Sequence, residues 1–163
     1  MAEAWLSGPL PGVDRALMPA AHALIQARAD LTAAEGATPE DLWARPGGAA
    51  AAGFHLRHLA GSLDRLMTYA RGEPLSEAQR AQLAAESSSG GEAAELVARA
   101  HDTIDAALAQ IRATPADQIY DGRSVGRAAL PATVIGLIFH GAEHTARHVG
   151  QLITTLKVVR GSR

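Results

Sequence analysis

The sequence contains no cysteine among its 163 residues. Disulfides, cysteine-based metal sites and a cysteine nucleophile are therefore excluded. Any metal ion must be bound by His, Asp or Glu, and any thiol that takes part in a reaction must come from outside the chain. Aromatic residues make up only 4% of the sequence, and β-branched residues are sparse beside alanine and leucine. This composition favours helices over strands.

The chain also lacks a basic excess and long apolar runs. Its formal net charge is -2, whereas nucleic-acid-binding proteins usually carry clustered positive charge. The longest strongly apolar stretch, residues 134–139, is too short to cross a bilayer, and the start of the chain lacks the pattern of a signal peptide. We therefore expect a cytoplasmic protein that acts on a small-molecule substrate and binds neither nucleic acid nor membrane.

The length suits one domain, residues 1–163, with one sizeable core. Apolar residues at helical spacing, with proline and glycine between the segments, predict four long helices. Thr38 and Ser76 each resemble the N-cap of a further short helix, and Pro131 suits the first turn of the last long helix. The pattern predicts an all-α fold, a four-helix bundle with short helical inserts. The long helices are expected at residues 14–34, 49–70, 92–113 and 131–159, and a loop at residues 121–130.

Five of the seven histidines lie in two short segments. His140, His144 and His148 are spaced by four, so they lie one turn apart on one side of the last helix. Two imidazoles at this spacing can bind a single metal ion. The helical phase places His148 beside the apolar stripe, His144 a little further round, and His140 nearer the boundary. The pair His144 and His148 is therefore the better candidate for a buried metal site.

The second segment holds His55 and His58, three residues apart on another long helix. Two histidines spaced by four, with no other histidine nearby, are more often surface or hydrogen-bonded residues than metal ligands. A second cluster on a neighbouring helix strengthens the metal interpretation, because one ion could then be held from two helices. The helical phase slightly favours His55 as the ligand, since His55 lies closer to the leucine stripe than His58 does.

Two strings of residues resemble the DinB/YfiT-like family of proposed metalloenzymes. One is Gly-Phe-His-Leu-Arg-His-Leu-Ala at residues 53–60, and the other is Glu-His-Thr-Ala-Arg-His-Val-Gly-Gln-Leu at residues 143–152. The resemblance covers nearly the whole chain and implies a four-helix bundle of unusual connectivity. It also implies a metal ion bound by His58, His144 and His148, and so favours His58 where phase favours His55. His55, Tyr69, His140 and Gln151 then become candidates for the pocket or for contacts to the ligands.

Three imidazoles suit a divalent transition metal such as Zn, Ni, Fe or Co. Family members with an assigned activity include transferases that join a low-molecular-weight thiol to an electrophile. The resemblance therefore implies a thiol-dependent S-transferase of the detoxification or stress-response type, with the thiol as cosubstrate. One alternative is a metal-dependent hydrolase, with Asp64 or Glu143 as general base. Another is a non-catalytic metal- or ligand-binding module. A homodimer is also open, because such bundles often pair through a helix face.

Overall fold

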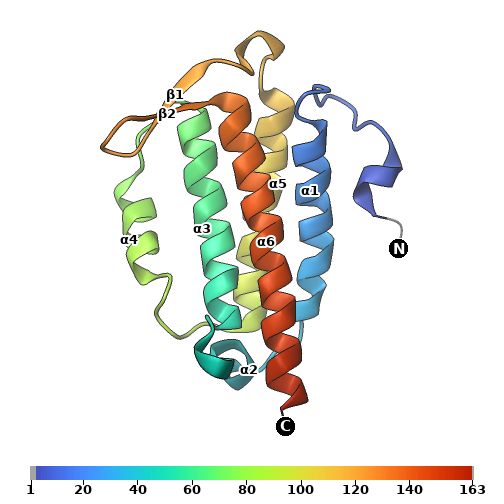
Figure 1. Ribbon diagram of the computed structural model, residues 1–163, viewed down its shortest axis with the longest axis vertical. Coiled ribbons are helices and arrows are strands. Elements are labelled where there is room, and N and C mark those ends of the chain that lie inside the picture. Colours follow the sequence, from blue (N-terminus) through green and yellow to red (C-terminus); the bar gives the residue numbers. More distant parts are fainter. Residues whose placement is uncertain (1–2, 163) are drawn as a thin grey trace.

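The computed structural model describes residues 3–162, which are mostly helical. Four long helices lie side by side: α1 (Met18–Asp30), α3 (Ala52–Ala70), α5 (Ala93–Ala113) and α6 (Val134–Gly161) (Figure 1). The most extensive contact joins α3 to α6, and α5 and α1 complete the group by packing against α3 and α6 respectively. The chain is thus all-helical in its main body, as the sequence predicts.

The core is built largely from leucine, isoleucine and alanine, most of them on the inward faces of these helices. Twelve large side chains are less than 2% exposed: Leu17, Leu24, Leu31, Leu42, Leu56, Leu59, Leu63, Ile104, Ile111, Ile119, Ile138 and Leu152. Burying an aliphatic side chain of this size contributes about 1.5–3 kcal/mol each. The core therefore holds the long helices in a fixed relation and makes them a rigid support for polar groups between them.

The short helical segments lie at the ends and the outer side of this body. Helices α2 (Pro39–Trp43) and α4 (Glu77–Ala85) begin after the N-caps Thr38 and Ser76, as the sequence predicts, and each N-cap is part of a capping box. Helix α4 lies on the outer side of α3 (Figure 1). Four short 3-10 helices accompany them in the described chain: Ala4–Ser7, Leu31–Ala34, Pro46–Gly48 and Ala116–Gln118.

The region predicted as a loop before the last helix contains a β-hairpin instead. Strand β1 (Gly122–Val125) pairs antiparallel with β2 (Leu130–Thr133), with Gly122 opposite Thr133. Pro131 belongs to β2 and does not begin α6, contrary to prediction. The Thr133 hydroxyl instead accepts a hydrogen bond from the Gly136 N–H, and this cap starts the helix at Val134.

Two other predicted starts also differ from the structure. Helix α1 begins at Met18, four residues after the expected start, because residues 15–17 form a turn. Helix α3 begins at Ala52, after the 3-10 turn at Pro46–Gly48 and an extended Ala51. In residues 3–162, no helix is both long and apolar enough to cross a membrane.

Helices α3 and α6 run antiparallel and approach closely at Gly141. A β-carbon at this position would lie 3.1 Å from Cδ1 of Leu63, so a larger residue would require the Leu63 side chain to shift. Because the helices run in opposite directions, residues just after Gly141 face residues just before Leu63. This contact brings the histidines of α6 opposite those of α3.

Candidate metal centre

Helices α3 and α6 bring His58, His144 and His148 together. One nitrogen of each imidazole lies within 4.8 Å of the others, an arrangement that could hold a metal ion. Nε2 of His58 lies 2.9 Å from Nε2 of His144, and the His148 ring lies 4.6 Å from the His58 ring and 4.5 Å from the His144 ring, between centroids. The three residues chosen from the resemblance therefore form one cluster.

The dimensions of the cluster suit a small divalent ion. Zinc–nitrogen bonds of about 2.0–2.1 Å at a tetrahedral angle place two ligand nitrogens about 3.4 Å apart. The 2.9 Å between the Nε2 atoms of His58 and His144 requires only a small outward movement of the rings to reach that spacing. Because the three imidazole donors are neutral, the ion would keep its full charge. With only three protein ligands, it would also have an open coordination position for a further ligand.

Glu86 fixes the protonation of His58. Its Oε2 lies 2.7 Å from Nδ1 of His58. A carboxylate accepts hydrogen bonds, so the proton of a neutral His58 ring resides on Nδ1 and the lone pair on Nε2. That lone pair is directed toward His144, on the side where an ion would be bound. The contact is of the carboxylate–histidine kind that orients metal ligands in proteins.

Glu86 is itself held in place by Arg65. Both residues are buried, with 6% and 8% exposure, and Nη1 of Arg65 donates to Oε1 of Glu86 at 2.7 Å. Burial acts to raise the pKa of Glu86, but the hydrogen bonds from His58 and Arg65 outweigh it, and the pKa is lowered. Gly61 leaves the space that this ion pair occupies, since a β-carbon there would lie 2.5 Å from Oε1 of Glu86.

Glu86 is a residue of the site that the sequence pattern did not predict. It lies 28 residues from His58 along the chain, at the end of a short helix whose other residues are largely exposed. No spacing rule connects such a residue to a histidine on another helix. Only the path of the chain after α4 turns this carboxylate inward.

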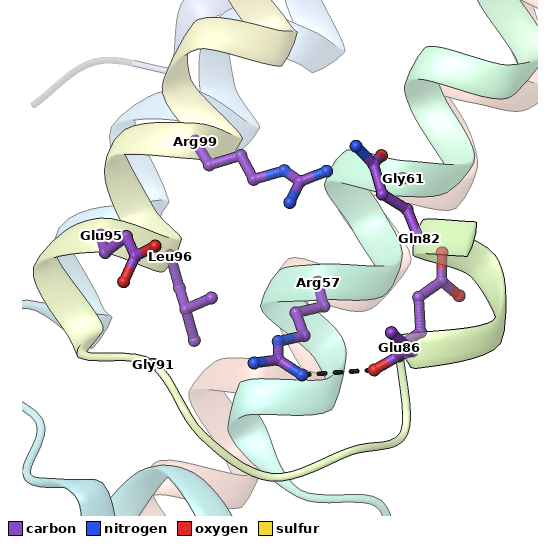
Figure 2. A pocket seen from close by; sticks show the side chains of 9 residues that line it. Arg57, Gly61, Gln82, Glu86, Gly91, Glu95, Leu96 and Arg99 are labelled. Carbon is purple, nitrogen blue, oxygen red and sulfur yellow. Dashed lines mark hydrogen bonds between the residues drawn. The ribbon is translucent and has the colours of Figure 1, made fainter. Parts of the chain in front are cut away.

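The loop after α4 is held on α3 by Arg57. Its Nη1 donates to the carbonyls of Ala85 and Ser88, and its Nη2 donates to the carbonyl of Gly90. Figure 2 shows Arg57 reaching from α3 toward the end of α4, where the Glu86 side chain also begins. The guanidinium group also lies over the Trp43 ring, 5.1 Å from its centroid. This set of contacts fixes the backbone on which Glu86 is carried.

His55 contacts the cluster from the inner side. It is buried, and its Nδ1 lies 2.9 Å from Nδ1 of His148. One of the two nitrogens must carry the proton of this hydrogen bond, and Nε2 of His148 is left available to an ion. Phase reasoning correctly placed His55 toward the core. His144 differs from its neighbours, because in residues 3–162 its buried Nδ1 has no hydrogen-bond partner.

The surroundings of His148, His144 and His55 favour the neutral form of these imidazoles. Burial, followed by the nearby His58 and other charged neighbours, lowers the pKa of His148 to about 4. Burial and His58 also lower the pKa of His144 and of His55. Neutral imidazole is the form that binds metal ions. His144 and His148 therefore need not lose a proton to bind an ion near neutral pH.

The remaining candidates from the sequence lie at the edge of the cluster or away from it. The His140 side chain is 53% exposed and approaches Glu143, and Gln151 is exposed. Tyr69 lines a separate cavity with Arg80 and Arg127. It lies eleven residues beyond His58 on α3, which corresponds to about 16 Å along a helix axis.

Comparison with known proteins bears on the family to which the chain belongs. No curated protein matches the chain. A family model described as the DinB superfamily matches residues 23–152, a range that contains the three clustered histidines, Glu86 and Arg65. Because this match covers most of the sequence, the chain belongs to the DinB superfamily.

Proposed function

We propose that the protein is a metal-dependent enzyme of the DinB/YfiT-like four-helix-bundle type, and that it transfers a low-molecular-weight thiol to an electrophile. The observation that carries the proposal is the three-histidine cluster, with the Nε2 lone pair of His58 directed inward by Glu86. A bound divalent transition metal would supply a Lewis acid that lowers the pKa of a thiol or water. His58, His144 and His148 would hold it.

The other residues of the site support this chemistry by position. Glu86 holds the Nδ1 proton of His58, and Arg65 keeps Glu86 ionised. The Phe54 ring stacks on His58 at 5.2 Å between centroids and shields one face of that imidazole from water. The chain has no cysteine, so the reacting sulfur comes from the cosubstrate. In the transfer, sulfur forms a bond to carbon of the electrophile, and the thiol proton leaves with the displaced group.

Hydrolysis is less well supported than thiol transfer. It requires a general base for a water molecule, and the candidates considered for this role are carboxylates. Asp64 accepts a hydrogen bond from Gln79, Glu143 pairs with Arg147 at the surface, and Glu86 is engaged by His58 and Arg65. Each of these carboxylates therefore has another role in the structure.

Metal content of the untagged protein tests the first part of the proposal. Wild type should hold about one transition-metal ion per chain, and His58→Ala, His144→Ala and His148→Ala should each lose it. His140→Ala serves as the control, because it removes an exposed imidazole from the same helix and should keep the ion. A wild-type protein that remains metal-free after reconstitution with Zn, Ni, Fe and Co would contradict the proposed centre.

Thiol consumption tests the second part. Metal-loaded wild type should consume glutathione, mycothiol or a related thiol with at least one electrophile of a panel, and the three His→Ala variants should not. A metal-loaded protein that consumes no thiol but hydrolyses an ester, amide or phosphate would identify the hydrolase instead. Inactivity in both screens, with the ion retained, would favour the non-catalytic module.

A further inference from the structure

A cavity of about 310 Å³ is lined in part by Phe54, whose ring stacks on His58 of the histidine cluster. The residues that line it are Trp43, Arg45, Phe54, Ser87 and Ser89, together with two alanines just before α3. Its volume is at the lower end of the range for small-molecule pockets. Phe54 is shared between the two sites, since its ring lines the cavity and also stacks on His58. A molecule in the cavity would therefore lie one side chain away from the metal ligands.

The lining combines two kinds of surface. Trp43 and Phe54 supply flat apolar rings, which suit a planar apolar group. Arg45 supplies a positive charge, and Ser87 and Ser89 supply hydroxyl donors. None of the described residues that line the cavity is acidic. The polar part of a matching ligand is therefore an anion with several hydrogen-bond acceptors, as a carboxylate is.

The surroundings of the cavity add to this positive character. Arg57 lies over the Trp43 ring. Helix α3 begins at the cavity with no side-chain cap at Ala51, so the positive end of its dipole is not neutralised by a capping side chain. Within residues 3–162, Arg45 makes only long hydrogen bonds, of 3.3 Å and 3.5 Å, to the carbonyls of Ala49 and Gly48. Its guanidinium is thus available for a stronger partner.

The cavity wall is also connected to the metal ligands. Ser87 directly follows Glu86, so adjacent residues of one loop face the cavity and His58. Arg57 holds this loop through the carbonyls of Ser88 and Gly90. The hydroxyl groups that would contact a ligand are therefore carried on a backbone that is already fixed on α3.

We propose that this cavity binds the organic substrate, and that the substrate is a small carboxylate with a flat apolar part. The carboxylate lies against Arg45 and the two serines, and the flat part lies between Trp43 and Phe54. This assignment rests on the proposed function for its role in a reaction, but binding itself requires no metal ion. The two proposals can therefore fail separately.

Trp43 provides a direct measurement of binding. The chain has only two tryptophans, and the other, Trp5, is 62% exposed in the N-terminal 3-10 helix. In a Trp5→Phe background, benzoate should change Trp43 fluorescence saturably. Benzamide, which has the same shape without the charge, should bind about tenfold more weakly, because a charged hydrogen-bonded pair is lost. Acetate, which lacks the ring, should bind weakly as well.

Arg45→Gln in that background should weaken benzoate binding about tenfold and leave benzamide binding unchanged. Arg45→Lys should restore part of the affinity. Arg112→Gln is the matched control, because Arg112 is an exposed arginine in the last turn of α5 and should not affect binding. No saturable response to benzoate, equal affinity for benzamide, or an unchanged Arg45→Gln variant would overturn the proposal.

The His144→Ala variant separates this proposal from the metal centre. It should lose the metal ion and still bind benzoate with the affinity of its parent. If benzoate binding disappears with the ion while Arg45→Gln retains it, the carboxylate is coordinated by the metal and the cavity assignment is wrong. If wild type binds no metal but Trp43 responds to benzoate as described, the cavity assignment stands and the metal centre fails.

Discussion

Oε2 of Glu86 lies 2.7 Å from Nδ1 of His58, although Glu86 follows α4 and His58 lies in α3. This contact determines which nitrogen of His58 carries the proton and therefore which one can bind an ion. Its partner contact to Arg65 keeps the carboxylate ionised within a buried site. The ion pair of Glu86 and Arg65 is thus part of the candidate metal centre, although neither of these two residues is a histidine of the cluster.

Glu86→Gln should weaken metal binding about 10- to 100-fold, as expected when a group that orients a metal ligand is lost. The amide keeps the size of the carboxylate but removes the negative charge that both His58 and Arg65 contact. Competition with a chromogenic chelator measures the affinity. Glu95→Gln is the control, because this exposed residue of α5 lines the cavity next to Glu86 without contacting His58. Equal affinities in the two variants would contradict the role of Glu86.

Gly61→Ala should reduce both metal affinity and stability. A β-carbon would lie 2.5 Å from Oε1 of Glu86 and 2.8 Å from Nη1 of Arg65, so the buried ion pair would have to move. Gly150→Ala is a matched control on α6, because a β-carbon there meets nothing within 4 Å. It should stabilise the protein by about 0.5–1 kcal/mol through helix propensity. Chemical denaturation and chelator competition on both variants check the contrast.

His55→Ala should weaken metal binding less than loss of any clustered histidine does. It leaves the three imidazoles in place and removes only the Nδ1 contact to His148, which orients that ring. We expect a decrease of about tenfold, in the range for outer contacts to metal ligands. Metal content and affinity are measured beside His58→Ala. If His55→Ala removes the metal ion and His58→Ala does not, His55 is the ligand in place of His58, as helical phase alone would suggest.

The metal-free protein should become less stable as the pH falls below about 6.5, the ordinary pKa of histidine. The pKa of His148 is lowered to about 4, and those of His144 and His55 are also lowered. Between these values the unfolded chain binds more protons than the folded chain, so acid favours unfolding. The contribution of these histidines to the free energy of unfolding is fully present above pH 6.5 and decreases as the pH falls toward 4.

Urea denaturation of the metal-free protein at several pH values between 7.5 and 4.5 measures this dependence. His148→Gln should flatten the curve, whereas His140→Gln, on the exposed side of the same helix, should leave it unchanged. Glu86 also has a lowered pKa, but its contribution is lost only below the ordinary carboxylate range, near pH 4.5 and under. A curve that is flat from pH 7.5 to 4.5 in wild type would contradict the neutral, buried state of these rings.

The sequence by itself determined the helical character of the chain, because apolar spacing and capping residues act within one segment. The capping boxes at Thr38 and Ser76 are local in this way. The spacing of His144 and His148 likewise determined that two imidazoles share one side of a helix. The choice of His58 over His55 came from the resemblance, since helical phase is too coarse to decide between two residues three apart.

The tertiary structure decided everything that depends on how distant segments meet. The β-hairpin before α6 depends on pairing between β1 and β2 rather than on strong strand propensity, so a local reading gives a loop. The position of Glu86 depends on the path of the chain after α4, and the cavity lined by Trp43 and Arg45 forms only where that loop meets the start of α3. Periodicity describes one element at a time, whereas these contacts arise from the packing of several elements around one core.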